Sequence, residues 1–240
     1  MKTIKIFFAV LAVITLNSCA FDINLGQENG NGNVVTEERN IGGEFTKVKG
    51  SAGLDVYLTK GSENKVVVEA DENLMEFIET EIRNDRLTIG TKRSIGRSKA
   101  KKVYVTYVEL TEIAASSGSD VIVNSVVKNE NISLDASSGA DLELEVFAKN
   151  IYIESSSGAD IKVRGKATKL KAKSSSGSDI DAEELLVINC DADASSGADI
   201  TVNVKGELET EATSGGTIRY YGNPSAVSKS GGRSGNVRKM

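Results

Sequence analysis

The amino-acid sequence predicts an all-β fold, a parallel β-helix or β-solenoid whose coils are each about 20 residues long. Three observations predict this fold. A Ser-Ser-Gly-x-Asp motif recurs through the C-terminal half of the 240-residue chain, and apolar and polar residues alternate on both sides of it. The chain also contains 23 Gly but one Pro and no Trp. Glycine suits tight bends, and proline is excluded from inner strands because it cannot donate a hydrogen bond to the ladder.

The repeated motif marks one bend in each coil. Five full copies are followed by a decayed sixth copy at 213–218, and successive glycines stand 21, 19, 19, 20 and 18 residues apart. We expect each Gly to adopt a positive φ, where a Cβ would be penalised, and the neighbouring Ser hydroxyls to satisfy backbone groups at the corner. The full copies begin at Ser116, Ser137, Ser156, Ser175 and Ser195.

Alternation around the motif predicts the strands of residues 111–222. Positions seven and five before each Gly, and three and five after it, carry mostly aliphatic or small residues, as expected for side chains that point into a narrow core. Each coil is therefore predicted to be a strand, a tight bend, a second strand and a more variable return, with like columns stacked ~4.8 Å apart. The third position after the Gly holds Val121, Leu142, Ile161, Ile180, Ile200 and Ile218.

Residues 34–110 carry the same register once and are predicted to be a less regular part of the solenoid. Gly53 and Asp55 fall on the columns of the motif's Gly and Asp. Segment 73–82 fits a short helix or an irregular strand equally well. Residues 223–240 repeat the composition of the bend without the strand pattern, and we expect them to cap the last coil or to leave it. Strand-like runs lie at 66–69, 87–91 and 103–108.

The N-terminus predicts export and lipid attachment. Two lysines precede an apolar run over 6–16, which has the length of a signal-peptide core and is too short to span a bilayer. The run ends in Leu-Asn-Ser-Cys, which resembles the bacterial lipobox, whose Cys is acylated and becomes the new N-terminus. We therefore predict a lipoprotein signal peptide at 1–18 and a lipid anchor at Cys19. Residues 19–33 are rich in Gly and Asn without apolar periodicity, which predicts a flexible tether.

The composition excludes several functions. The chain has no His, so Ser-His-Asp, Cys-His and His-zinc chemistries are excluded. Its 34 acidic and 29 basic residues give a formal net charge of −5, which argues against nucleic acid as a partner because phosphate neutralisation needs a basic face. Cys190 stands in an inward column and is predicted to be a buried thiol.

The carboxylates of the motif form the sharpest candidate site. Stacked coils would place them in one outward column, where adjacent charges ~4.8 Å apart repel by about 1 kcal/mol in water. Hydrogen bonds from Ser hydroxyls and bend amides would offset this repulsion, and so would bound Ca²⁺, which prefers oxygen ligands. We expect no other metal and no cofactor. This candidate cation or ligand ladder comprises Asp120, Asp141, Asp160, Asp179 and Asp199.

A second candidate site is a group of basic residues around Gly96. We expect a protruding loop that is either only solvated or in contact with anionic lipid headgroups or acidic glycans. The residues of this basic segment are Lys92, Arg93, Arg97, Lys99, Lys101 and Lys102.

Several segments together resemble one known family. They are 45–48 leading into 53–58, then 66–71 and 87–89, followed by the Ser-Ser-Gly-x-Asp coils. Through them the chain resembles the bacterial head GIN-domain family, described as auto-transporter adhesins and common as lipoproteins of Bacteroidetes-type bacteria. Gly53-Leu54-Asp55 stands where that family has Gly-Ile-Asn, so two of the three residues differ. The resemblance implies a right-handed β-helix and a role in adhesion or surface binding.

These observations predict a non-catalytic, lipid-anchored β-solenoid of the bacterial cell envelope that binds a glycan, lipid or protein. By analogy with the family, Ala20 after the anchor favours the outer membrane. Two alternatives stay open, namely a β-helix enzyme acting on acidic polysaccharide and a purely structural envelope spacer. An enzyme would break its repeat to form a cleft and would differentiate its acid from its base, whereas these coils keep short bends and identical Asp residues.

Overall fold

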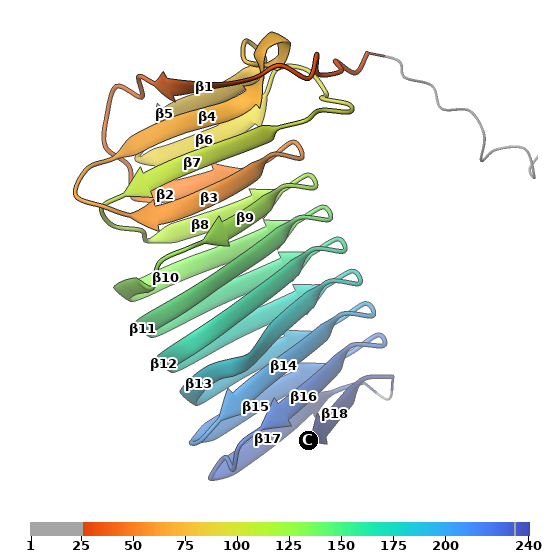
Figure 1. The fold of residues 1–240 in the computed structure, drawn as a ribbon. Helices are drawn as coiled ribbons and strands as arrows, with labels where there is room; N and C mark the ends of the chain where they lie inside the picture. Colours follow the sequence, from red (N-terminus) through yellow and green to blue (C-terminus); the bar gives the residue numbers. More distant parts are fainter. Residues whose placement is uncertain (1–25, 233) are drawn as a thin grey trace, which may run out of the picture.

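A computed structural model describes residues 26–232 and 234–240 (Figure 1). Within these residues the protein is all-β, with 18 strands, one short 3₁₀-helix and no α-helix. Parallel strands about 19 residues apart stack into a β-solenoid of about 7 turns, which confirms the predicted fold class. None of the helices in the described ranges is long and apolar enough to cross a membrane.

The regular coils run from strand to tight bend to strand and then return. Leu142 pairs with Ile161 and Leu134 with Ile153, so the predicted columns do superpose. Figure 1 shows the tight bends along one edge and the returns along the opposite edge. The strands are β8 (Glu112–Ser116), β9 (Asp120–Val123), β10 (Val127–Ser137), β11 (Asp141–Ser156), β12 (Asp160–Ser175), β13 (Asp179–Ala194), β14 (Asp199–Val204), β15 (Glu207–Ala212) and β16 (Thr217–Tyr221).

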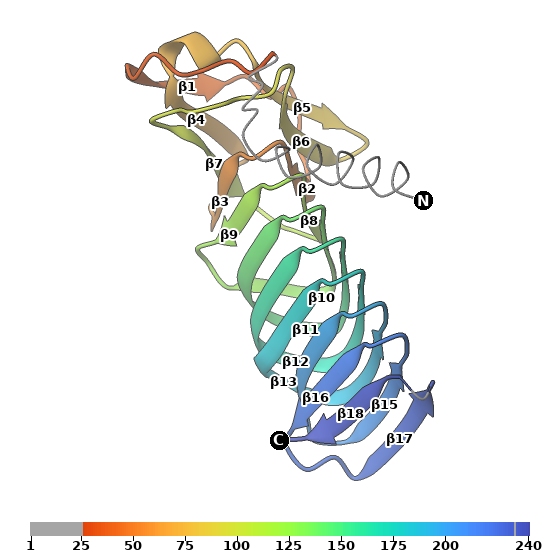
Figure 2. The same cartoon turned by 90° about the vertical axis from the view of Figure 1, so that its right-hand side faces the viewer.

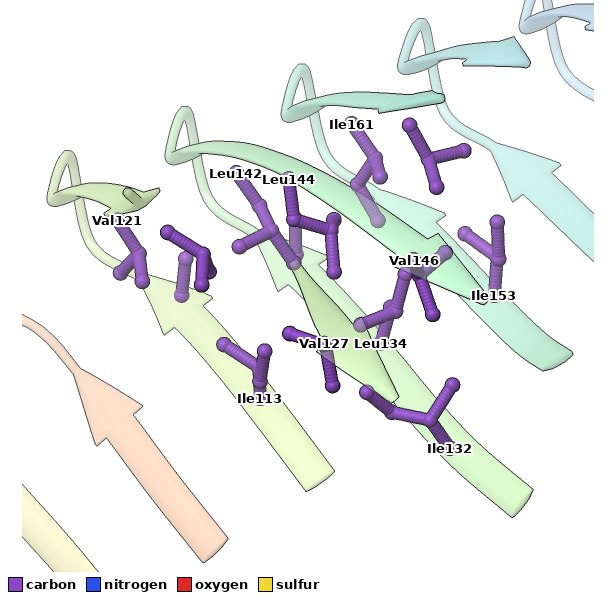
Figure 3. Packing of buried hydrophobic residues seen from close by; sticks show 14 of the residues in the cluster. Ile113, Val121, Val127, Ile132, Leu134, Leu142, Leu144, Val146, Ile153 and Ile161 are labelled. Carbon is purple, nitrogen blue, oxygen red and sulfur yellow. The ribbon is translucent and has the colours of Figure 1, made fainter. Parts of the chain in front are cut away.

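Aliphatic side chains from both sides of each coil fill a narrow core (Figure 3). Ile113, Leu134 and Ile153 stack on one side, and each is fully buried. Towards the bend the coil narrows, and the inward positions are taken by small residues such as Ala136 and Ala140. The core therefore tapers in the way that the change from Ile and Leu to Ala and Ser in the sequence predicts.

Each bend is a two-residue turn in which both central residues have positive φ. Ser117 has a φ of 55° and Gly118 one of 69°, and the Ser119 amide donates to the Ser116 carbonyl across 3.3 Å. These are the features of a type I′ turn. The positive φ of the glycine column is confirmed, but the positive φ of the preceding Ser was not expected. The Gly amide donates to the corresponding Ser carbonyl of the next coil, as Gly118 does to Ser138 at 3.1 Å.

Buried serines beside the turn, rather than the central serine of the turn, hydrogen-bond the backbone through their hydroxyl groups. Ser155 Oγ donates to the Ala159 carbonyl at 2.7 Å, and Ser174 Oγ does the same to Ser178 at 2.8 Å. The expectation that Ser hydroxyls satisfy the corner is therefore correct for these inward positions. The central Ser of each turn is exposed instead, as Ser117 is.

An N-terminal cap closes one end of the solenoid. Its β2–β3 rung pairs in parallel with β8–β9 on one side and with β6–β7 on the other, which places Gly53 and Asp55 in the predicted columns. The other pairings, β1 with β4, β4 with β7 and β5 with β6, are antiparallel. The cap comprises β1 (Val34–Arg39), β2 (Lys47–Gly50), β3 (Asp55–Lys60), β4 (Lys65–Asp71), η1 (Glu72–Leu74), β5 (Ile78–Arg83), β6 (Arg86–Thr91) and β7 (Lys101–Tyr107).

The prediction of irregular coils over 34–110 therefore holds for only part of the cap. The antiparallel β5–β6 hairpin arises because Asn84 and Asp85 both adopt positive φ, at 50° and 66°, and form a type I′ hairpin turn. Segment 73–82 contains the end of the 3₁₀-helix and then most of β5, so it is both a short helical turn and a strand.

The predicted tether over 19–33 is wrong for its C-terminal part. Glu28 forms a β-bridge with Ile95, and Gly30 donates its amide to the Arg97 carbonyl at 2.8 Å. These hydrogen bonds attach the chain to the cap before β1 begins. The predicted signal peptide, Cys19 and the first part of the tether lie outside the described residues.

The C-terminal residues 223–240 do not leave the last coil, and they extend it. β17 (Ala226–Gly231) pairs in parallel with β15, and β18 (Asn236–Lys239) pairs in parallel with β16. Gly215 donates its amide to the Ser234 carbonyl at 3.1 Å, which continues the hydrogen bonds of the bend column. Figure 2 shows this rung at the end opposite the cap. In this segment the bend-like composition therefore predicted the structure better than the absence of a strand pattern did.

Candidate functional site

A groove of about 770 Å³ crosses the coils where each return leads into the next strand. Its central part is lined by three adjacent columns of β10, β11, β12 and β13. The lining residues are Thr111, Asn129, Asn131, Ile132, Ser133, Asn150, Ile151, Tyr152, Lys169, Leu170, Lys171, Asn189, Cys190, Asp191, Glu207 and Glu209.

Between the two rims of the groove lies a column of almost fully buried residues, whose side chains face the core. Ile132, Ile151, Leu170 and Cys190 follow one another along the solenoid axis and are 2 to 4% exposed. They belong to the first inward column after the return. Cys190 is a free, buried cysteine, as predicted. Burial, and to a smaller extent the charge of Asp191, raise the pKa of its thiol far above the ordinary value, so the thiol stays protonated and unreactive.

One rim of the groove is a column of amides. Asn131, Asn150 and Asn189 occupy equivalent positions in three coils. Lys169 takes that position in the coil between those of Asn150 and Asn189. Asn150 Nδ2 donates to Asn131 Oδ1 at 2.7 Å, and Asn189 Oδ1 accepts the Glu207 amide at 3.0 Å. These bonds fix the amide orientations.

The opposite rim carries an aromatic ring and charged groups. The Tyr152 hydroxyl donates to Glu154 Oε2 at 2.6 Å, and this hydrogen bond, with burial and the charge of Glu154, raises the pKa of Tyr152 to about 12. The Tyr152 side chain is therefore neutral, and it is fixed by the backbone at one end and by Glu154 at the other. Lys171 pairs with Asp191 at 3.0 Å in the next coil, in the register that the sequence predicts.

A second hollow, of about 510 Å³, lies on the return side and shares Asn129 with the groove. Two apolar side chains are exposed there, Phe147 at 36% and Ile188 at 51%. Lys166 and Lys205 also line this hollow.

The predicted carboxylate ladder exists and is longer than expected. Asp55 of the cap stacks on Asp120, and the pairing continues through the five motif residues to Asp199. Burial, followed by the charges of neighbouring carboxylates, raises the pKa of Asp141 and Asp179. These two carboxyl groups therefore hold their protons more readily than an isolated Asp does.

Neither of the two arrangements expected to offset the repulsion is seen along the ladder in the described residues. The amide of Asp141 bonds the Ser119 carbonyl of the preceding coil, so bend amides serve the backbone rather than the carboxylates. Asp199 accepts a hydrogen bond from Arg219 at 3.1 Å. Across residues 26–232 and 234–240, no group of three or more Cys, Asp or Glu side chains is arranged to hold a metal ion. The carboxylates form a line and do not converge on a point.

The basic segment folds against the cap. Arg93 forms an ion pair with Glu28 at 2.7 Å and lies over the Phe77 ring, 5.2 Å from its centroid. Lys92 pairs with Glu79 at 3.5 Å and Lys102 with Glu69 at 3.8 Å. Three of the six predicted residues are thus engaged with acidic groups of the cap. The others are Arg97, Lys99 and Lys101.

The groove was missed at the level of sequence. Its outward columns differ from rung to rung, with Ser, Tyr, Lys, Asp and Glu in one of them, and outward polar positions are ordinary on any solenoid. A signal was nevertheless present, because Asn131, Asn150 and Asn189 recur at the period of the repeat. The repeat pattern does not specify the concavity that makes these residues a site.

Comparison with known proteins identifies one matching family and several similar structures. The family described as "Putative auto-transporter adhesin, head GIN domain" matches residues 44–224. This description names an adhesin rather than an enzyme and indicates a protein of the cell surface or envelope. None of the curated proteins matches the chain.

Three crystal structures have the same fold. A "putative adhesin" from Bacteroides fragilis NCTC 9343 is 18% identical, with a TM-score of 0.82 over 89% of this chain and 100% of that one. A "putative lipid binding protein" from Parabacteroides distasonis ATCC 8503 is 20% identical, with a TM-score of 0.73 over 89% and 99%. A "putative adhesin" from Parabacteroides merdae ATCC 43184 is 20% identical, with a TM-score of 0.68 over 90% and 99%.

Proposed function

Because the chain belongs to the head GIN-domain family, which matches it over residues 44–224, we propose that it is a lipid-anchored, non-catalytic β-solenoid of the bacterial outer membrane that binds a partner at the cell surface. The observation that carries this proposal is the family's description as an adhesin. The uninterrupted stack of coils supports it, since it presents a long, ordered surface.

The enzyme alternative has less support. Acid–base catalysis on a polysaccharide needs two carboxyl groups in different environments on either side of the bond that breaks. The ladder carboxylates repeat one environment along a line, and the groove has a net negative charge that opposes an acidic substrate. A purely structural spacer would need no groove.

The anchor at Cys19 would hold the cap end close to the membrane. Six residues lie between Cys19 and Gly26, where the described chain begins, and the seven residue-to-residue steps from Cys19 to Gly26 span at most about 25 Å. Because residues from Glu28 onwards are attached to the cap, the coils would project away from the lipid. Arg97 and Lys99 lie near this attachment and are the remaining candidates for contact with anionic headgroups.

Fatty-acid labelling tests the anchor. Cells that express the full chain should incorporate labelled palmitate into the protein, and Cys19→Ser should abolish the label and release the protein from the membrane fraction. A control Cys190→Ala variant should keep both. Labelling that persists in Cys19→Ser would contradict the anchor.

Adhesion is tested with the same cells. Attachment of the bacteria is measured on glycan-coated, protein-coated and host-cell surfaces. On the surface that carries the partner, removing the protein should reduce attachment by at least about tenfold. Expression of the full chain should restore it. Attachment that does not depend on the protein on any surface would refute the proposed function.

A further inference from the structure

We infer that the groove over β10–β13 binds a neutral glycan laid across the coils, an inference that rests on the proposed surface-binding function. Its volume of about 770 Å³ lies within the range of small-ligand sites, about 300 to 1,000 Å³. Its walls combine the aromatic ring of Tyr152 with polar side chains on both rims. That combination suits a sugar, whose ring has apolar C–H faces and a polar edge of hydroxyl groups.

The amide rim supplies the hydrogen-bonding chemistry. A primary amide both donates and accepts, as a sugar hydroxyl does, so Asn can match hydroxyl groups without regard to charge. The bond from Asn150 Nδ2 to Asn131 Oδ1 uses one donor hydrogen of Asn150 and one lone pair of Asn131. Both side chains are at least partly exposed in the groove.

Tyr152 supplies a preorganised apolar surface. Its ring lines the groove, and its hydroxyl is bonded to Glu154 at 2.6 Å, so little side-chain entropy is left to lose on binding. A fixed tyrosine ring that packs against a ligand face is a common contact in binding surfaces.

The charges of the groove favour a neutral ligand. Two lysines, Lys169 and Lys171, face three carboxylates, and Lys171 is already paired with Asp191. The net charge is one negative, which gives no attraction for an acidic polysaccharide or an anionic headgroup. The second hollow, with Lys166 and Lys205 beside Phe147 and Ile188, is the better candidate for such a group.

The repeat favours an extended ligand over a single sugar. Equivalent rim positions recur in successive coils at the strand spacing of ~4.8 Å, so a polymer lying along the axis would meet a polar group at every rung. Each contact would be weak, and the sum over four rungs would be sufficient for measurable affinity.

Calorimetry with purified full-length protein tests the inference. The probes are hexasaccharides of cellulose, laminarin, mannan and chitin, with oligogalacturonate and anionic phospholipid vesicles as charged comparators. We expect at least one neutral hexasaccharide to bind, and its Kd to rise at least about tenfold in Ser133→Trp, which fills the groove, and in Tyr152→Ala. Thr201→Trp, an outward position of β14 outside the groove, is the matched control and should leave the Kd within about twofold.

Three results would overturn the inference. They are the absence of binding by every neutral hexasaccharide at millimolar concentration, binding that survives in Ser133→Trp with an unchanged melting temperature, and a groove that takes the charged comparators instead. The adhesion experiment separates this failure from failure of the proposed function. Cells carrying Ser133→Trp that still attach would refute the groove as the site while leaving protein-dependent attachment intact.

Discussion

The cap and the coils are built from the same kind of strand and are held together differently. In the coils each residue pairs with its equivalent about 19 positions later, so one set of packing rules serves every rung. In the cap, Val34 pairs with Asp71 and Lys47 with Arg86, and no pairing repeats another. The coils rely on one repeated set of backbone bonds, whereas the cap adds the bonds of a particular side chain, Asp71, to pairings that do not repeat. Substitutions in the two regions should therefore lower the free energy of unfolding by different amounts.

The largest effect is expected at a coil position where backbone meets backbone. Gly165 has a φ of 124°, and a Cβ there would clash with the Val146 carbonyl of the neighbouring coil. Gly165→Ala should lower the free energy of unfolding by more than about 3 kcal/mol. The matched control is Gly158→Ala in a bend, where nothing lies within 4 Å of the new Cβ and only the positive φ costs about 1 kcal/mol. Equal losses in urea denaturation would contradict the close packing of the return.

The next largest effect is expected at the side chain that fastens the cap. Asp71 is buried and accepts the amides of Gly32, Lys99 and Ala100 at 2.9 to 3.0 Å. In Asp71→Asn a side-chain NH₂ group would face backbone N–H donors. The free energy of unfolding should therefore fall by about 2 kcal/mol. Hydrogen exchange should then speed up at those three amides but not in the coils.

The control for that variant is a second cap carboxylate. Asp85 accepts the Thr46 amide and hydroxyl, but its side chain is 48% exposed, so Asp85→Asn should have a smaller effect. A loss as large as that of Asp71→Asn would mean that burial does not distinguish the two sites.

Acidification should act on the two regions in opposite directions. Burial tends to raise the pKa of Asp71, but three backbone donors outweigh it and lower the pKa below the ordinary value of 3.8. Its stabilising contribution is therefore present above pH 3.8 and lost as the pH falls below it. Burial and carboxylate neighbours raise the pKa of Asp141 and Asp179, so their contribution is present below pH 3.8 and lost as the pH rises through the raised values.

Hydrogen-exchange protection, corrected for intrinsic rates, measures this difference. As the pH falls towards 3.8 the coil amides should gain protection, and below about pH 3.8 the cap amides bonded to Asp71 should lose protection first. A parallel loss in both regions would show that the ladder carboxylates do not repel in solution.

The smallest effect is expected from neutralising one ladder carboxylate. Asp160 stands between Asp141 and Asp179, so Asp160→Asn should raise stability by about 0.5 kcal/mol. Asp181→Asn is matched in charge, but Asp181 stands beside Lys162, and its removal should be neutral or slightly destabilising. Thermal melting of the two variants would sharpen the comparison, and a lower melting temperature for Asp160→Asn would contradict it.

The same contrast explains what could be predicted from the sequence. The columns of the coils, the glycine bends and the Asp ladder follow from one repeat, because equivalent residues must occupy equivalent places. The cap could not be read in this way, since the Asn84–Asp85 turn that makes β5–β6 a hairpin lacks the glycine usual at such a turn. The attachment of Gly30 and Gly32 depends on Asp71, some forty residues away, which composition cannot reveal. The groove is lined by residues of several types from several coils, so no single residue type in the sequence marks it.

The I′ bends have a further consequence for how such a molecule can change in size. Each coil brings the chain back to the same corner one rung further along, and its hydrogen bonds reach only the rungs above and below. If a coil were duplicated or deleted, the coils on either side of the change would therefore still pair in the same register. Length in this architecture varies in whole rungs, and the reach of the molecule from its attachment can change by duplication while its cross-section stays the same.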